Sequence, residues 1–233
     1  MTPPPTATAT PSTTPTATPL PSALIGVDVT RLPTSKHVVA LTFDAGANAD
    51  GVPKIVATLR AKDVPATFFL TGSWVTSFPQ QARDIGAEFA VGDHSVTHPH
   101  FNQLSDDAAR SEVEQARLVI RDATGVDPKP LFRFPFGEHN AGNRALVNGL
   151  GYVSIGWTVD TLGWQGTSGG RTADSVKQRV LAGLQPGEVV LMHVGSNPTD
   201  RSTLDADALA AVIDAIRFAG YGFVTIPGGL GLS

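Results

Sequence analysis

Short apolar runs alternate along the chain with longer stretches that mix apolar and polar positions. The apolar runs are typical of buried strands, and they cover residues 37–43, 66–70, 88–92, 131–136, 152–159, 188–194 and 221–226. The mixed stretches are helix-like, and they cover residues 52–62, 79–85, 105–123, 141–150, 172–184 and 205–219. Ser105 and Asp205 have the character of helix N-caps, and Gly125 and Gly220 stand where helices are expected to end.

Alternation of strands with helices predicts an α/β fold in which parallel strands are covered by helices. About seven strand–helix units fit into the roughly 200 residues that follow Leu24. This number favours a distorted, incomplete (β/α) barrel with about seven parallel strands over an open doubly wound sheet. The Gly-rich polar segment 160–171 is expected to form a loop near the carboxyl end of a strand.

The first 22 residues are almost entirely Thr, Pro, Ala and Ser and carry no charge. Such a segment buries too little apolar surface to offset its ordering entropy. We therefore expect residues 1–23 to be a disordered linker and residues 24–233 to be one folded domain. This composition is typical of extracellular stalks, and no basic or apolar leader precedes it. We expect an extracellular or cell-surface protein whose signal or anchor has been removed; an intracellular protein with a low-complexity tail is the alternative.

Composition narrows the classes of partner. The net charge is −4, and no apolar run reaches the length of a membrane span. This argues against nucleic acid and against membrane contact, except through the removed anchor or signal. The chain has no cysteine, so a metal site would have to use His, Asp or Glu. Composition leaves the oligomeric state open, and we expect a monomer.

Reactive side chains recur where the predicted strands end. Asp44 follows the first strand, His94 the third and Asp160 the fifth. Arg133 lies within the fourth strand, and His193 ends the sixth. Because parallel strands place their carboxyl ends on one face, these five side chains should share one rim.

The segment 93–100, DHSVTHPH, contains three of the six histidines. The i, i+4 spacing of His94 and His98 lets two imidazoles meet one metal, and Pro99 favours a loop at His98. We expect a divalent metal here, with Zn²⁺ favoured by imidazole ligands. Two surface histidines are the alternative, and His100 is expected to be exposed. The remaining histidines without an evident partner are treated as structural: His37 and His139.

Two residues stand in unusual surroundings. Arg133 lies in an apolar strand, where a buried arginine needs an anion such as Asp44 or Asp160; a snorkelling surface residue is the alternative. Trp164 lies in a Gly-rich polar loop, which favours a sugar-stacking platform or a pocket wall over a core position. His193 ends a buried strand, and the alternative to a site residue there is a core histidine whose hydrogen bonds are satisfied.

Five motifs occur in order: TFDAG, HSVTH, RFPFG, DTLGW and LMH. Through them the chain resembles the polysaccharide deacetylase family (NodB-like domain, carbohydrate esterase family four) over about residues 36–230. The resemblance implies a distorted (β/α) barrel. It also implies hydrolysis of acetyl groups from a polysaccharide with the help of a divalent metal, a reaction at carbon–nitrogen bonds other than peptide bonds.

By position, the resemblance implies a role for each rim residue. Asp44 matches the catalytic base, Arg133 the arginine that holds it, and His193 the general acid. His94 and His98 match the metal ligands. The residues that match the substrate site are Phe136, through its backbone N–H as the oxyanion donor, and Leu191 and Trp164, which line the acetyl pocket.

Two positions depart from the family pattern. The first motif usually carries a second acid, the third metal ligand, and here it is Ala45. Asp44, Asp50 or water could take its place, whereas strand alternation should point Asp93 away from the metal.

The fourth motif usually carries an acid before its aromatic residue, and here it is Gly163. In the family this carboxylate orients the catalytic histidine. Asp160 is the candidate to orient His193 instead, or it only anchors Arg133.

The leading hypothesis is a metal-dependent deacetylase acting on N-acetylglucosamine units of peptidoglycan or a chitin-like polymer. One alternative is an O-acetyl esterase of the xylan type; His193 as proton donor weakly favours the amide, whose leaving group needs the proton more. The other alternative is a catalytically weak glycan-binding protein, which the two missing acids favour.

Overall fold

The computed structural model describes residues 19–232. Within them one sheet of parallel strands runs in the order β1-β6-β5-β4-β3-β2-β8-β7, and β9 pairs with β2. The strands are β1 (Asp28–Val29), β2 (Val38–Ala45), β3 (Ala66–Leu70), β4 (Ala90–Asp93), β5 (Leu131–Phe132), β6 (Val153–Ile155), β7 (Val159–Asp160), β8 (Glu188–His193) and β9 (Gly222–Phe223). In this part of the chain the end strands β1 and β7 do not pair with each other, which confirms the predicted incomplete (β/α) barrel.

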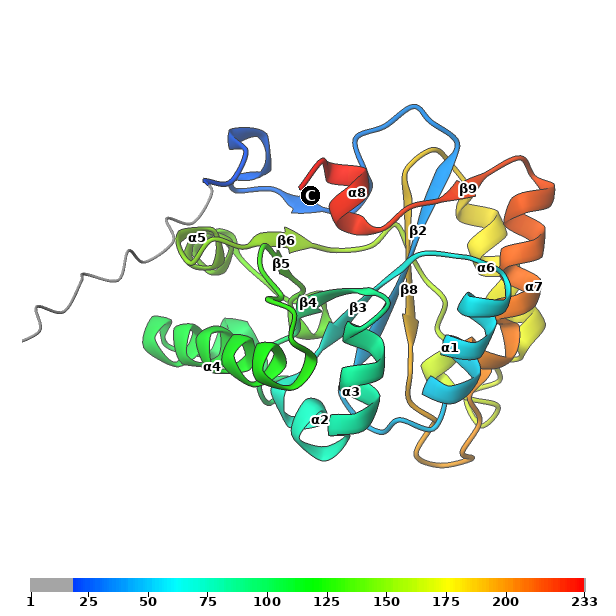
Figure 1. The fold of residues 1–233 in the computed structure, drawn as a ribbon, viewed down its shortest axis with the longest axis horizontal. Helices are drawn as coiled ribbons and strands as arrows, with labels where there is room; N and C mark the ends of the chain where they lie inside the picture. The colour runs from blue at the N-terminus through cyan, green and yellow to red at the C-terminus, as the bar shows by residue number, and fades with distance from the viewer. Residues whose placement is uncertain (1–18, 233) are drawn as a thin grey trace, which may run out of the picture.

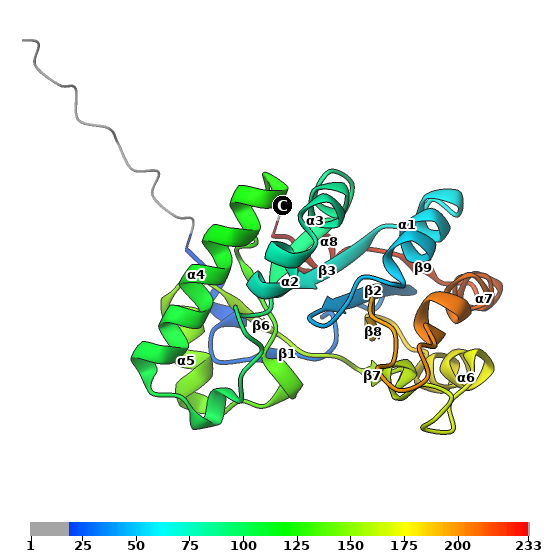
Figure 2. The ribbon, with the colours of Figure 1, turned by 90° about the horizontal axis from the view of Figure 1, so that it is seen from below.

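Helices cover the outer side of the curved sheet (Figures 1 and 2). They are α1 (Val52–Ala61), α2 (Gly72–Ser77), α3 (Pro79–Gly86), α4 (Asp106–Thr124), α5 (Ala141–Gly149), α6 (Ala173–Gly183) and α7 (Leu204–Phe218). The short helix α8 (Ile226–Leu230) lies on the inner side instead, where Ile226 packs with Ala40 and Val189. In Figure 2, α4 and α5 lie at one side of the molecule and α6 and α7 at the other, with α1, α2 and α3 between them.

Strand β2 lies near the middle of the sheet and is buried almost throughout. Its odd-numbered residues Leu41 and Phe43 pack in the main core with apolar residues of α1 and α7. Because side chains alternate along a strand, Thr42 and Asp44 point to the other face, inside the curve of the barrel. Both contact Arg133 there, so the pattern of β2 puts polar groups inside the barrel.

Several predicted elements differ in extent. The predicted strand 152–159 is two strands: β7 lies at one end of the sheet, and β6 lies next to β1 at the other end. The segment 131–136 gives the short β5 and then a 3-10 turn, Pro135–Gly137. The segment 221–226 gives β9, after which Thr225 caps α8. The sequence pattern did not predict β1, α2 or α8, all of which are short.

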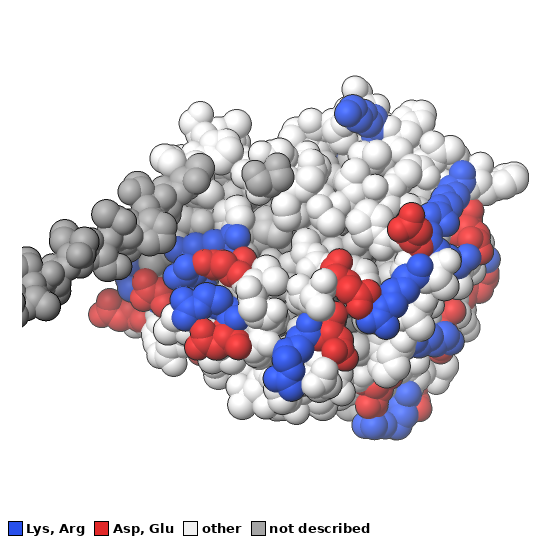
Figure 3. All heavy atoms as spheres, viewed as in Figure 1, with Lys and Arg blue, Asp and Glu red and all other residues white. Residues whose placement is uncertain are grey.

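The predicted linker, residues 1–23, lies outside the described residues as far as residue 18. Ser22–Leu24 form a 3-10 turn whose Leu24 is buried. No helix in 19–232 is long and apolar enough to cross a membrane. On the face shown in Figure 3, basic and acidic side chains are intermixed.

Candidate active site

The five predicted rim residues lie at the same end of the sheet. Asp44 on β2 is the register partner of His193 on β8, so these two side chains stand on neighbouring strands. His94 directly follows β4, and Arg133 directly follows β5. Asp160 ends β7, which pairs with β8. The topology therefore brings together five residues that are up to 149 positions apart, from Asp44 to His193.

Arg133 is fully buried, and Asp44 is the acid that it contacts. Its Nη1 donates to Asp44 Oδ1 at 2.7 Å and to the Thr42 hydroxyl at 2.9 Å. Its Nε and Nη2 donate to the carbonyl oxygens of Ile155 and Gly156. Burial alone would raise the pKa of Asp44, but the nearby Arg133 guanidinium and histidines lower it overall. Asp44 is thus held as a carboxylate in a buried place.

His94 and His98 lie on a loop after β4, with ring centroids 4.8 Å apart. The loop is fixed from both sides. The Asp93 carboxylate accepts from the Ser95 N–H at 2.8 Å, and Glu112 on α4 accepts from the N–H of Val96 at 2.9 Å and of Thr97 at 2.8 Å. The His98 N–H donates to the Ser95 hydroxyl at 3.1 Å. These bonds hold His98 at a φ of +60°, in the left-handed region that non-glycine residues seldom adopt.

Both imidazoles are in a state in which a ring nitrogen can donate its lone pair to a metal. His94 Nδ1 lies 2.8 Å from the Arg133 carbonyl and must donate a proton to it, which leaves Nε2 with its lone pair. That Nε2 lies 3.4 Å from Asp44 Oδ2. Burial lowers the pKa of His94 and lowers that of His98 to about 4, so both rings are neutral at pH 7. This is the state in which histidine binds a metal.

A third metal ligand is less evident. Across residues 19–232, no group of three or more His, Cys, Asp or Glu side chains is arranged to hold a metal. Asp50 does not take the place left by Ala45, because its carboxylate bonds Ser196 at 2.6 Å and Arg201 at 2.8 Å. Asp93 points away, as predicted, and is buried against Tyr152. The residues present fit a metal through two imidazoles, with Asp44 as the neighbouring carboxylate.

His193 meets a different acid from the one expected. Its Nδ1 lies 3.6 Å from Asp205 Oδ2, and its backbone N–H donates to the same oxygen at 2.8 Å. Asp160 instead bonds within its own turn, to the Leu162 N–H at 2.8 Å and the Trp164 indole at 3.4 Å. Burial would lower the pKa of His193, but Asp205, with help from Asp44 and Asp160, raises it overall.

The prediction that Asp205 is the N-cap of a helix is wrong. The N-cap of α7 is Thr203, and Asp205 lies in the first turn with its carboxylate buried. An acid in the first turn of a helix is so common that its sequence position gives no sign of a buried contact. The contact depends on how α7 packs beside β8, and local sequence does not reveal that packing.

A cavity of about 350 Å³ opens among the rim residues. Its lining combines predicted catalytic residues with predicted substrate residues: Asp44, His98, Phe136, Trp157, Asp160, Trp164, Leu191 and His193. A second hollow of about 300 Å³ shares Asp44, His98, Trp164 and His193 with it and adds His94. The predicted site residues therefore face a common space, with Arg133 buried behind Asp44.

Phe136 and Trp164 form the exposed walls of this cavity, being 53% and 48% exposed. The Phe136 ring stacks on His100 at 4.3 Å and meets His98 edge-on at 4.5 Å. The Phe136 backbone has a φ of +59°, which turns this residue at the cavity edge. His100 is exposed, as predicted, and pairs with Glu138.

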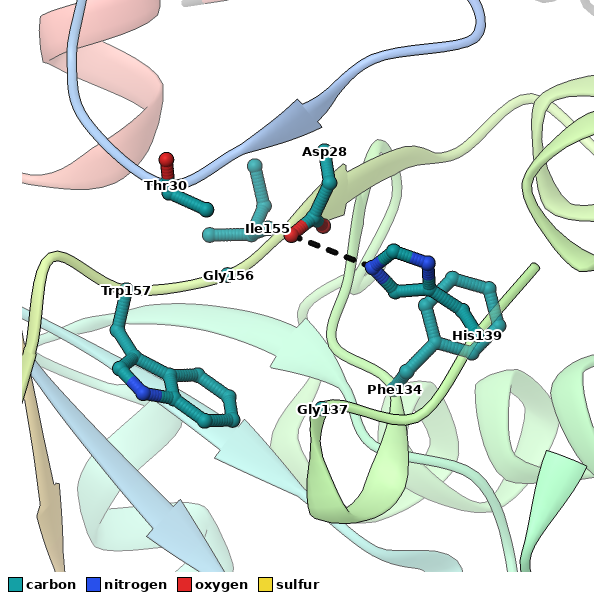
Figure 4. A pocket seen from close by; sticks show the side chains of 8 residues that line it. All are labelled: Asp28, Thr30, Phe134, Gly137, His139, Ile155, Gly156 and Trp157. Carbon is teal, nitrogen blue, oxygen red and sulfur yellow. Dashed lines mark ion pairs between the residues drawn. The ribbon is translucent and has the colours of Figure 1, made fainter. Parts of the chain in front are cut away.

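A neighbouring cavity of about 230 Å³ contains none of the predicted site residues. Figure 4 shows Asp28 and His139 paired on one side of it, and Trp157 on the other side. His139 Nε2 lies 3.3 Å from Asp28 Oδ2. Trp157 lines both this cavity and the larger one. His139, which had no evident partner in the sequence, thus pairs with Asp28 in the structure. His37 stacks on Tyr221 and also lies outside the site.

Comparison with known proteins shows the family of the chain. The family model "Polysaccharide deacetylase" matches residues 31–155. The chain belongs to the polysaccharide deacetylase family. This family is generally divalent-metal dependent.

Curated members of the polysaccharide deacetylase family cover most of the chain. A peptidoglycan-N-acetylglucosamine deacetylase of Bacillus cereus is 33% identical over 84% of the chain and 69% of its own length. A chitooligosaccharide deacetylase of Bradyrhizobium is 31% identical over 81% of the chain and 89% of its own length. The chain spans 41% of the length of three Listeria monocytogenes deacetylases of peptidoglycan that are also 33% identical.

Solved structures of the polysaccharide deacetylase family include both active and inactive members. The Bc1960 peptidoglycan N-acetylglucosamine deacetylase superposes with a TM-score of 0.80 at 30% identity, over 88% of this chain and 92% of that one. A family pseudoenzyme of Bacillus anthracis, BA3943, superposes with a TM-score of 0.78 at 30% identity, over 86% of this chain and 68% of that one. The fold is therefore shared by proteins that differ in catalytic competence.

Proposed function

We propose that the protein is a metal-dependent hydrolase that removes the acetyl group from N-acetylglucosamine units of a polysaccharide. The observation that carries the proposal is the position of Asp44. Its carboxylate lies between the Arg133 guanidinium, at 2.7 Å, and His94 Nε2, at 3.4 Å, and opens into a cavity that His193 also lines. A base and an acid thus face one space from adjacent strands.

Asp44 is suited to be the base and His193 to be the acid. The lowered pKa of Asp44 keeps it charged, and the raised pKa of His193 favours its protonated form. Asp44 takes a proton from the water that attacks the acetyl carbon. His193 gives a proton to the departing amine nitrogen, which yields acetate and a free amino group. The backbone N–H of Phe136 stabilises the oxyanion, a contribution often worth about 3 kcal/mol.

His94 and His98 would hold the divalent metal, with Zn²⁺ favoured by two imidazoles and no thiolate. The bond from His94 Nδ1 to the Arg133 carbonyl and the neutral state of both rings support this assignment. When bound, the metal supplies Lewis-acid polarisation of the acetyl carbonyl. Water would complete the ligand set that Ala45 leaves short.

The substrate assignment rests on the cavity and on the relatives. Trp164 and Phe136 offer exposed aromatic faces for a sugar ring, and Leu191 closes the acetyl end. Relatives named as deacetylases of peptidoglycan and of chitooligosaccharides favour a polymer of N-acetylglucosamine, and with it an extracellular or cell-surface location. Within this proposal residues 24–233 are the catalytic domain, acting as a monomer.

The test is acetate release from N-acetylglucosamine oligomers by metal-stripped protein, before and after one equivalent of Zn²⁺. We expect release only after zinc is added. Asp44→Asn should abolish it, and His37→Ala, a change at a histidine remote from the site, should not. Equal release without zinc would contradict the metal assignment, and release only from acetyl-xylan would replace the deacetylase with an O-acetyl esterase.

A second candidate is a glycan-binding protein without catalysis. Two observations favour it: Ala45 removes the acid that the family uses as third ligand, and the pseudoenzyme BA3943 has nearly the same structural similarity as the deacetylase Bc1960. This candidate predicts that N-acetylglucosamine oligomers bind to the zinc-loaded protein and quench Trp fluorescence, while no acetate is released.

A further inference from the structure

Asp205 is among the most buried acids of the described chain, with 3% of its surface exposed. Three groups surround its carboxylate. Oδ1 accepts a hydrogen bond from the Thr161 hydroxyl at 2.7 Å. Oδ2 accepts from the His193 backbone N–H at 2.8 Å and lies 3.6 Å from His193 Nδ1. The carboxylate therefore holds the His193 backbone by a hydrogen bond and stands next to the ring, whose buried Nδ1 has no hydrogen-bond partner among the described residues.

The space that Asp205 occupies is the space that a side chain at position 163 would need. A Cβ added to Gly163 would lie 2.3 Å from Asp205 Oδ1, 2.6 Å from its Cγ and 2.9 Å from its Oδ2. These distances are far below van der Waals contact. Any residue larger than glycine at 163 would therefore have to displace the carboxylate of Asp205.

We infer that Asp205 is the positioning residue for His193, and that Gly163 is glycine because the carboxylate reaches the site from α7 instead of from position 163. This inference rests on the proposed function, in which His193 is the proton donor. The carboxylate of Asp205 comes from α7 and occupies the space into which a side chain at position 163 would extend.

The geometry distinguishes Asp205 from the other acids that face His193. Asp44 reaches the rim from β2 but is bonded to Arg133, and Asp160 on β7 is bonded to Leu162 and Trp164. Only Asp205, among these three, bonds the His193 backbone directly. A carboxylate close to Nδ1 stabilises the charged imidazole.

The first experiment compares Asp205→Asn with Asp207→Asn in the zinc-loaded protein. Asn keeps an oxygen for the His193 N–H but has no charge, and Asp207 is the exposed acid two positions along the same helix. We expect acetate release to fall at least about tenfold in Asp205→Asn and to stay within twofold of the unchanged protein in Asp207→Asn. The alkaline limb of the pH profile should move to lower pH only in Asp205→Asn.

The pKa of His193, measured by NMR of its imidazole nitrogens, tests the contact without any need for catalysis. It should fall in Asp205→Asn and stay unchanged in Asp207→Asn. If the unchanged protein releases no acetate, the proposed function fails, but this titration still tests the contact. If acetate is released and neither rate nor pKa responds to Asp205→Asn, the inference is overturned while the proposed function stands.

A swap of the acid gives the sharpest test. Gly163→Asp alone should lower activity by the clash, and Asp205→Ala alone should lower it by loss of the carboxylate. The double variant Asp205→Ala/Gly163→Asp should be more active than either single variant. A double variant that melts like the unchanged protein but is no more active than Asp205→Ala would overturn the inference.

Discussion

Two parts of the site each lack an acid that the family pattern carries. We call the part around His193 the proton-transfer corner and the part around His94 and His98 the metal corner, after their roles in the proposed function. Only in the proton-transfer corner does another acid stand in the place of the missing one. At Gly163 the missing side chain leaves a space that the carboxylate of Asp205 fills. At Ala45 the missing acid leaves a methyl group fully buried in the main core. In the described residues no other acid completes a third ligand beside the two imidazoles.

The difference teaches that a carboxylate is replaceable where a neighbouring element already approaches the site. Helix α7 begins next to β8, so an acid in its first turn reaches His193. Among residues 19–232 no comparable carboxylate reaches the place of Ala45, since the candidate Asp50 is bonded to Ser196 and Arg201. Under the proposed function, the proton-transfer corner therefore has a carboxylate, whereas the metal corner would rely on two histidines, Asp44 and water.

The largest expected effect comes from Arg133, which supports both corners through Asp44. Arg133→Met should lower the free energy of unfolding by about 3–5 kcal/mol, because it leaves the buried Asp44 carboxylate without its partner. Urea unfolding measures the change. The control is Arg201→Met, which removes an exposed pair with Asp50 and should cost less than about 1 kcal/mol. Equal losses in the two variants would contradict the buried pair.

Glu188 is a contrast to Asp44 and Asp205. It is a buried acid whose carboxylate oxygens have no hydrogen-bond partner in the described part of the chain. It starts β8, the strand that His193 ends, and burial raises its pKa to about 7. The folded protein thus favours the protonated acid, and the resulting stability is lost as the pH rises from 4.5 through 7. Glu188→Gln should gain on the order of 3 kcal/mol in unfolding free energy, relative to the unchanged protein, between pH 4.5 and pH 8.

Thermal or urea unfolding at several pH values measures this gain. Glu114→Gln, a change at an exposed acid on α4, should show no such trend. A gain from Glu188→Gln that does not depend on pH would mean that the glutamate is not protonated in the fold.

Ala45→Asp tests whether the metal corner is short of one ligand. The added carboxylate should tighten Zn²⁺ binding by at least about tenfold, or about 1.4 kcal/mol, and lower the stability of the metal-free protein. Calorimetric titration measures the affinity, and Ala45→Asn is the control of equal size without charge. Unchanged zinc affinity in Ala45→Asp would contradict the claim that the metal corner is short of one ligand at position 45.

The residues of the rim could be predicted from the sequence because each of them is placed by the end of its own strand. Asp44, His94 and His193 each stand at the end of an apolar run, and parallel strands collect such ends on one edge. The split of segment 152–159 into two strands was not predictable from apolar pattern alone. Neither was the partner of His193, because Asp205 lies 12 positions away on a helix whose packing the local sequence does not encode.

The most direct test of the account follows acetate release and zinc occupancy in one titration, with metal-stripped protein and N-acetylglucosamine oligomers. The account predicts that release rises with zinc and stops rising at one equivalent, in the unchanged protein and more steeply in Ala45→Asp. Zinc that binds at His94 and His98 while no acetate is released would contradict it, and would identify the protein as a glycan-binding member of the family.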